Sequence, residues 1–172
     1  MDKKFSAKDL TVTAAAAALV FLTTYTFKIP APSGYTHLGD CMIFISVLLL
    51  GTKRGALAGG IGAALADALG GYTQYILPTF FIKAIMAVIM GVFTYKIFKG
   101  KKYGWFVGAV VGGVAQIILY TLIKIPMYDV VYALSRLPGN ILQTGTGIAI
   151  ASVIIAVLDK SGVLNRLRDM GG

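Results

Sequence analysis

Two ionisable residues, Asp67 and Lys83, stand inside apolar runs near the middle of the chain. Placing a charge among apolar side chains is costly, so such residues generally mark a functional site. The segment between them, residues 70–78, reads GGYTQYILP. Its Tyr, Thr and Gln side chains suit a small ring-shaped ligand that forms hydrogen bonds. The same pattern is compatible with a structural Asp–Lys pair beneath an ordinary connecting loop.

Further polar residues lie towards one end of the apolar segments. The opposite halves, 43–50, 84–93 and 148–157, carry almost no hydrogen-bonding side chains beyond Ser and Thr. A channel or proton relay needs polar groups along its whole length, whereas a pocket open to one side needs them in one half only. Attraction of polar side chains to the membrane interface would explain the position of Asp40 or Lys124, but it explains the positions of Lys83 and Gln116 poorly. The pattern therefore favours a pocket, with polar residues Asp40, Asp67, Lys83, Gln116, Tyr120, Asn140, Gln143 and Thr144.

The composition indicates which kind of protein must position these residues. Of the 172 residues, 57% are hydrophobic and 13% are charged, and the mean hydropathy is +0.79. These values predict an integral membrane protein. The net charge of +9 comes from short basic clusters between long apolar segments, which argues against binding to nucleic acid. The single cysteine, Cys41, and the single histidine, His37, exclude an internal disulfide and a multi-histidine metal site, and no metal or cofactor is expected.

Six apolar segments are candidates for membrane-spanning helices, because a span needs about 20 apolar residues and fewer where neighbouring helices cover it. Breaks at Pro30 and Pro32, at Gly51 with Lys53 and Arg54, and at GKKYG separate several of them. The amphipathic segment 125–137 is too short to span and is expected to lie across the mouth of the bundle. The predicted helices are 9–28, 39–52, 55–70, 78–98, 104–124 and 138–158, in a single all-α domain over residues 1–172.

The basic residues predict the orientation of this bundle, since cytoplasmic loops are enriched in Lys and Arg. With the N-terminus inside, twelve basic residues face the cytoplasm and only Lys28, Lys124 and Arg136 lie outside. The sequence therefore predicts six helices with both termini cytoplasmic. The inner set is Lys3, Lys4, Lys8, Lys53, Arg54, Lys96, Lys99, Lys101, Lys102, Lys160, Arg166 and Arg168.

The first predicted helix contains five consecutive alanines, in which Ala14 and Ala18 form a small-xxx-small pair. Such pairs let another helix approach closely. Internal packing needs only one smooth face, whereas this block is smooth on every face, so a partner or sliding surface is favoured over internal packing alone. Gly108 and Gly112 repeat the spacing in the fifth helix, where internal packing is favoured.

Nearly the whole chain resembles the substrate-binding (S) components of energy-coupling factor (ECF) vitamin transporters. The resemblance rests on the size, the six helices, the alanine-rich first helix and three motifs: GYTHLGD, GALAGGIGAALADALGGY and FFIKAIMAVIMG. Within that family the chain is most similar to the hydroxymethylpyrimidine and pyridoxine members, and less similar to the riboflavin members. The thiamine members use a tryptophan-rich site, but the only tryptophan here, Trp105, lies at the predicted cytoplasmic end.

The resemblance implies a high-affinity binding protein in the bacterial plasma membrane. Such a subunit captures a vitamin or vitamin precursor outside the cell. Hydroxymethylpyrimidine is the ligand most favoured by the resemblance, and pyridoxine is the next. It then docks, through Ala14 and Ala18 of its first helix, on a membrane coupling (T) subunit that is driven by two cytoplasmic ATPase subunits. This chain has no GxxxxGK[ST] loop, so the energy must come from those partners.

The expected ligand is a small heteroaromatic alcohol, held by aromatic stacking and a few converging hydrogen bonds. Asp67 is expected to pair mainly with Lys83 behind the pocket, because an unpaired charge at that depth is costly. Asp40 is expected behind the pocket as well. The predicted ligand-binding residues are Tyr35, His37, Tyr72, Gln74, Tyr75, Lys83, Gln116, Tyr120, Asn140 and Gln143.

Two other functions stay open on the sequence alone. An autonomous carrier or small channel would need internal repeats or a continuous polar path, and neither is evident. An intramembrane enzyme could use Asp40 and Asp67 as a carboxylate pair, but no motif supports it, so the chain is predicted not to be an enzyme.

Overall fold

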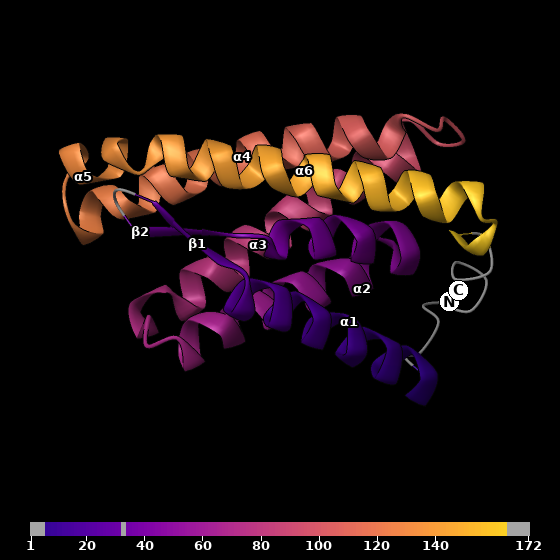
Figure 1. The fold of residues 1–172 in the computed structure, drawn as a ribbon, viewed down its shortest axis with the longest axis horizontal. Coiled ribbons are helices and arrows are strands. Elements are labelled where there is room, and N and C mark those ends of the chain that lie inside the picture. The colour runs from indigo at the N-terminus through magenta and orange to yellow at the C-terminus, as the bar shows by residue number, and fades with distance from the viewer. Residues whose placement is uncertain (1–5, 32–33, 165–172) are drawn as a thin grey trace.

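The computed structural model describes residues 6–31 and 34–164, with only the backbone described for residues 28–31 and 34–35. It is a bundle of long helices with one short β-hairpin near one end (Figure 1). The hairpin was not predicted. The elements are α1 (Ala7–Thr26), β1 (Lys28–Ala31), β2 (Gly34–His37), α2 (Gly39–Leu69), η1 (Thr73–Tyr75), α3 (Ile76–Val92), η2 (Phe93–Ile97), α4 (Gly104–Met127), α5 (Val130–Ser135) and α6 (Leu137–Lys160).

Within the described residues, five helical stretches are long and apolar enough to cross a membrane. This agrees with the predicted integral membrane protein, but it is one helix fewer than the sequence predicted. The difference arises at α2, which counts once although the sequence predicted two helices there, 39–52 and 55–70. The five stretches are Ala7–Thr26, Gly39–Leu69, Thr73–Ile97, Gly104–Met127 and Val130–Lys160.

Helix α2 reverses direction at Gly51. This residue has φ 81° and ψ 175°, a conformation that glycine adopts without strain and that breaks the helix. A Cβ atom added at Gly55 would lie 2.6 Å from Cα of Val47, and one added at Gly59 would lie 2.8 Å from Cγ2 of Ile43. Residues on either side of Gly51 therefore meet in antiparallel order, so the two halves of α2 form a helical hairpin.

Small residues let the other helices pack closely as well. A Cβ added at Gly62 of α2 would lie 2.4 Å from the carbonyl oxygen of Ala17 in α1. One added at Gly108 or Gly112 of α4 would lie 2.6 Å from a carbonyl oxygen of α3, that of Met90 or Met86 respectively. The predicted internal role of Gly108 and Gly112 is thus confirmed, because backbone contact at this distance leaves no room for a side chain.

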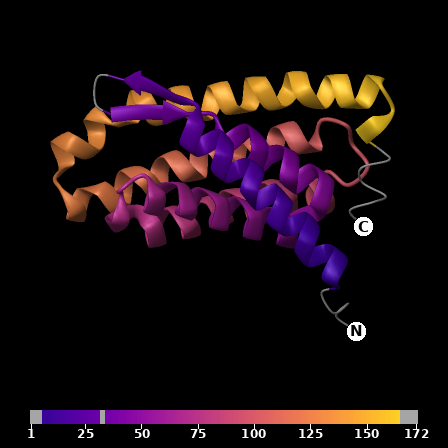
Figure 2. The ribbon, with the colours of Figure 1, turned by 60° about the horizontal axis from the view of Figure 1, so that its bottom comes forward.

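One end of the bundle is covered by short elements. The antiparallel strands β1 and β2 pair Lys28 with His37, and α5 follows the end of α4 just after Pro126. In both views the hairpin and α5 lie at the end of the bundle opposite the start of α1 and the end of α6 (Figures 1 and 2). The predicted non-spanning segment 125–137 thus consists of the last turn of α4, the short helix α5 and the first residue of α6.

Candidate ligand-binding site

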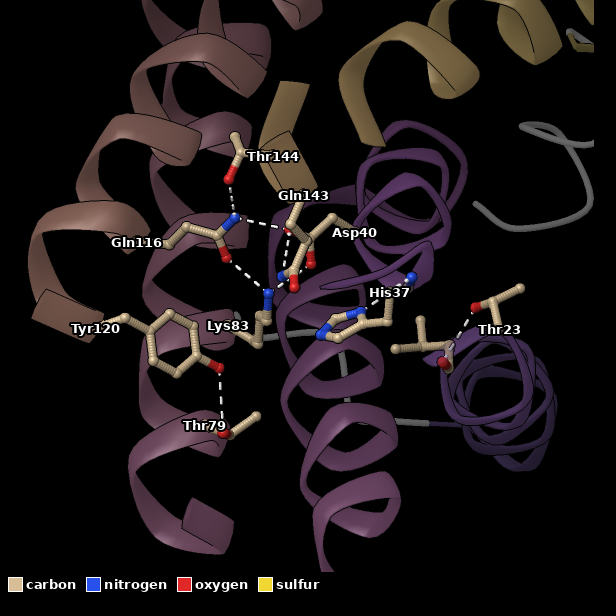
Figure 3. Close-up of polar contacts among 11 residues, drawn as sticks. Thr23, His37, Asp40, Thr79, Lys83, Gln116, Tyr120, Gln143 and Thr144 are labelled. Carbon is tan, nitrogen blue, oxygen red and sulfur yellow. Dashed lines mark hydrogen bonds and ion pairs between the residues drawn. The ribbon is translucent and has the colours of Figure 1, made fainter. Parts of the chain in front are cut away.

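A buried polar network joins α2, α3, α4 and α6 (Figure 3). The Lys83 ammonium donates to Asp40 Oδ1 at 2.5 Å and to Gln116 Oε1 at 2.7 Å. The Gln116 amide donates to Asp40 Oδ2 at 2.7 Å and to Thr144 Oγ1 at 2.6 Å, and Gln143 donates to Asp40 Oδ2 at 3.2 Å. Asp40 and Lys83 are completely buried, where an unpaired charge is costly. Each neutralises the charge of the other, and the neutral amides complete their hydrogen bonds.

Glycines of α4 and α6 make this network possible. A Cβ added at Gly147 would lie 2.8 Å from Cβ of Asp40, and one added at Gly113 would lie 2.4 Å from Cγ2 of Thr144. Helix α6 can therefore approach both α2 and α4 closely enough for short amide and hydroxyl contacts.

The structure corrects the predicted partner of Lys83. The sequence predicted Asp67, but the ion pair that Lys83 forms is with Asp40. Asp40 stands in the first turn of α2, packed against α6, whereas Asp67 stands near the end of the same helix and lines a cavity. The folding back of α2 brings both carboxylates to the same end of the bundle, and only Asp40 reaches the ammonium group.

That cavity has a volume of about 150 Å³ and lies at the end of the bundle that carries α5 and the β-hairpin. Tyrosine rings and hydrogen-bonding side chains make up most of its wall, a combination suited to a small, flat, polar ligand. The lining residues are His37, Asp67, Tyr72, Tyr75, Thr79, Tyr120, Lys124, Tyr132, Arg136, Asn140 and Gln143.

The structure places the predicted ligand-binding residues differently, and only some of them line the cavity. Lys83 and Gln116 lie in the buried network and do not line the cavity. Gln74 also lies off the wall, 3.4 Å from the hydroxyl of Tyr128. The side chain of Tyr35 lies outside the described residues. Those that the structure brings together around the cavity are His37, Tyr72, Tyr75, Tyr120, Asn140 and Gln143.

Four lining residues were not predicted: Thr79, Lys124, Tyr132 and Arg136. The hydroxyl of Tyr120 lies 3.1 Å from that of Thr79, and Lys124 Nζ lies 5.3 Å from the centroid of the Tyr120 ring. Helical spacing was a usable signal, because Lys124 follows Tyr120 by four residues and therefore lies on the same helix face. Lys124 and Arg136 had instead been assigned to outer loops.

Hydrogen-bond donors face the cavity from several sides. His37 Nδ1 accepts the backbone N–H of Gly39 at 3.2 Å, so the neutral ring carries its proton on Nε2. Arg136 Nε and Asn140 Nδ2 are buried donors with no hydrogen-bond partner among the described residues. Buried donors are normally satisfied, so this wall suits a ligand that supplies acceptors.

Comparisons with known proteins agree with these observations. Residues 4–160 match the family model of the ECF-type riboflavin transporter, S component. The chain is 30% identical over 171 residues to the thiamine precursor transporter HmpT of Lactococcus lactis subsp. cremoris, covering 98% of this chain and 97% of that protein. It is also 35% identical over 145 residues to an uncharacterised protein of Pyrococcus woesei, covering 82% of this chain and 95% of that protein.

The family model covers most of the chain, and the HmpT match extends over nearly all of it. Both describe transporters and not enzymes, as the sequence predicted. The long apolar helices are those of a multi-pass membrane protein. The chain belongs to the S components of ECF-type transporters, in the family described by the riboflavin transporter model.

Proposed function

We propose that this protein is the substrate-binding subunit of an ECF-type importer that captures a small water-soluble vitamin or precursor, first of all hydroxymethylpyrimidine, at the outer face of the membrane. The observation that carries the proposal is the cavity lined by Tyr72, Tyr75, Tyr120 and Tyr132, together with hydrogen-bonding groups, at one end of the bundle. Four aromatic rings and several polar groups match a flat, polar heteroaromatic alcohol. The name of the relative HmpT, a thiamine precursor transporter, favours this ligand class.

The distribution of basic residues supports the proposed outer position of the cavity. Lys53 and Arg54 follow the bend in α2, and Lys99, Lys101 and Lys102 lie between η2 and α4. These positions belong to the end of the bundle away from α5 and the β-hairpin (Figure 1). In the proposed arrangement that end faces the cytoplasm, both halves of α2 cross the membrane, and six crossings leave both termini inside.

The exposure pattern of helix α1 supports the proposed docking on a coupling subunit. Ala14 and Ala18 are exposed, while Thr13 and Ala17, on another face of the same helix, are buried. The alanine block therefore serves two purposes: one face packs inside the bundle and the other offers a smooth surface to a second helix. In the proposed cycle the ATPases act through the coupling subunit that binds this surface.

Two measurements test the proposal. The first is co-purification from the native membrane, in which coupling and ATPase subunits accompany an S component but not an autonomous carrier or channel. The second is calorimetry on the isolated chain with hydroxymethylpyrimidine, and with pyridoxine as the comparison ligand. Failure of both ligands to bind would contradict the proposed ligand class, and uptake without ATPase subunits would contradict the importer role.

Cavity variants sharpen the second measurement. Tyr72→Ala and Asn140→Ala each remove a lining group, so each is expected to weaken binding by about 1–3 kcal/mol, or about ten- to a hundredfold. Leu77→Ala is the matched control, because Leu77 is exposed on the outside of α3 and does not line this cavity. Unchanged affinity in both cavity variants would place the ligand elsewhere.

A further inference from the structure

Two cationic side chains on the cavity wall, Lys124 and Arg136, form no ion pair with any described residue. Lys124 is 5% exposed, and none of the ion pairs or side-chain hydrogen bonds among the described residues includes its ammonium group, which lies over the ring of Tyr120. Arg136 lines the same cavity, and the ion pairs among the described residues do not include it. A buried cation without a partner is costly in a membrane protein, so a bound anion would stabilise both.

Donors without acceptors lie beside these cations. Arg136 Nε and Asn140 Nδ2 are both buried and unpartnered among the described residues. They lie one helical turn apart, with Arg136 directly before α6 and Asn140 in its first turn, where the Asn140 backbone N–H donates to the Arg136 carbonyl. Lys124 contributes from α4. The ammonium group of Lys124, the Nε–H of Arg136 and the side-chain NH2 of Asn140 can each donate a hydrogen bond but cannot accept one.

The charge balance of the site points the same way. Lys83 and Asp40 neutralise each other in the network behind the cavity. Among the described lining residues, Asp67 is the one carboxylate, and Lys124 and Arg136 are the two side chains of fixed positive charge. The wall therefore carries one more positive than negative charge, with the excess on the side formed by α4 and α6.

We infer that Lys124, Arg136 and Asn140 form an anion subsite that binds a phosphate monoester on the substrate, so that the phosphorylated form of the ring alcohol is held more tightly than the free alcohol. Three donors on separate side chains match the three terminal oxygens of a phosphate monoester better than the two of a planar carboxylate. The inference rests on the proposed function as a small-molecule binding subunit. It adds the chemical class of the substituent that the donor-rich wall recognises.

The test is calorimetry on the full chain in lipid nanodiscs with three probes: hydroxymethylpyrimidine, its phosphate monoester and inorganic phosphate. The monoester is expected to bind at least about tenfold more tightly than the alcohol, since hydrogen bonds to charged groups are the stronger class. Inorganic phosphate is expected to compete with the monoester. Lys124→Met and Arg136→Gln should each remove most of the preference for the monoester, and Arg136→Lys should retain part of it.

The matched control is Lys101→Gln, which removes one positive charge from an exposed loop at the other end of the bundle and should keep the full preference. Binding of the alcohol with equal or weaker binding of the monoester overturns the anion subsite and leaves the proposed function intact. Binding of neither by a chain that co-purifies with its partners overturns the subsite and the ligand class but not the importer role. If a variant fails to fold, the ratio of the two affinities in the unmodified protein still decides.

Discussion

Lys83 of α3 and Asp40 of α2 form an ion pair in which neither side chain has any exposed surface. Gln116 bonds both members, donating to the carboxylate and accepting from the ammonium group. Such a pair contributes little net stability compared with a packed apolar pair, but loss of one member leaves an uncompensated buried charge. The pair therefore fixes how α2, α3 and α4 meet beneath the cavity.

Removal of one member should be strongly destabilising. Lys83→Met leaves Asp40 charged and buried, so we expect a loss of about 3–5 kcal/mol, visible as a lower midpoint of thermal unfolding in detergent. The double variant Lys83→Met with Asp40→Leu should recover much of that loss. Lys102→Met is the control, because the Lys102 side chain is 96% exposed and its contact with Asp159 is 4.0 Å. A single variant as stable as the unmodified chain would contradict the role of the pair.

Two glycine-to-alanine changes should differ in their effect on stability. At Gly55 the new Cβ would lie 2.6 Å from the Val47 backbone, so the two halves of α2 must separate, at an expected cost of about 1–3 kcal/mol. At Gly145 of α6 nothing lies within 4 Å, so alanine should leave stability unchanged or raise it by up to about 1 kcal/mol. Thermal unfolding of the two variants measures the contrast. Equal midpoints would argue against the close antiparallel contact within α2.

The proposed orientation can be tested with single cysteines and a membrane-impermeant thiol reagent. A cysteine at Gly100 should react only after the cells are opened, whereas one at Val131, which is 78% exposed on α5, should react in intact cells. The native Cys41 is buried and should stay unlabelled in both. Labelling of the Gly100 position from outside would reverse the topology.

The alanine face of α1 should separate docking from ligand binding. Ala14→Trp or Ala18→Trp should abolish transport while calorimetry on the isolated chain shows unchanged affinity, because both residues are exposed and do not line the cavity. Val114→Trp, on the exposed face of α4, is the control and should support normal transport. If Ala14→Trp instead removed ligand binding and kept the complex assembled, the docking surface would lie elsewhere.

The level of each polar residue along the bundle could be predicted from the sequence, because the position of a residue within an apolar run determines its depth. Which polar residues pair with each other across helices could not be predicted in this way. Asp40 and Asp67 lie at the same end, and only the packing of α2 against α3 and α6 decides which one meets Lys83. For Lys124 the sequence held two conflicting signals: its four-residue spacing from Tyr120 placed both on one helix face, whereas its position at the end of an apolar run suggested an outer loop, and the structure places it on the cavity wall.

The β-hairpin was missed for a related reason. Its strands are four residues each, too short for an alternating pattern to stand out, and the two proline residues in this segment suggested only the end of a helix. By contrast, the break near Gly51 was predictable, since a glycine followed closely by Lys53 and Arg54 interrupts an apolar run.

The reversal within α2 bears on how the chain enters the membrane. At about 1.5 Å per residue, its halves on either side of Gly51 measure about 18 Å and about 27 Å, and each falls short of the roughly 30 Å hydrocarbon layer. Only one non-helical residue, Gly51, separates the two halves, so no loop is available to stay on one side of the membrane while a single half inserts. On the proposed topology both halves must therefore insert together as one unit, while Lys53 and Arg54 remain on the cytoplasmic side throughout biogenesis.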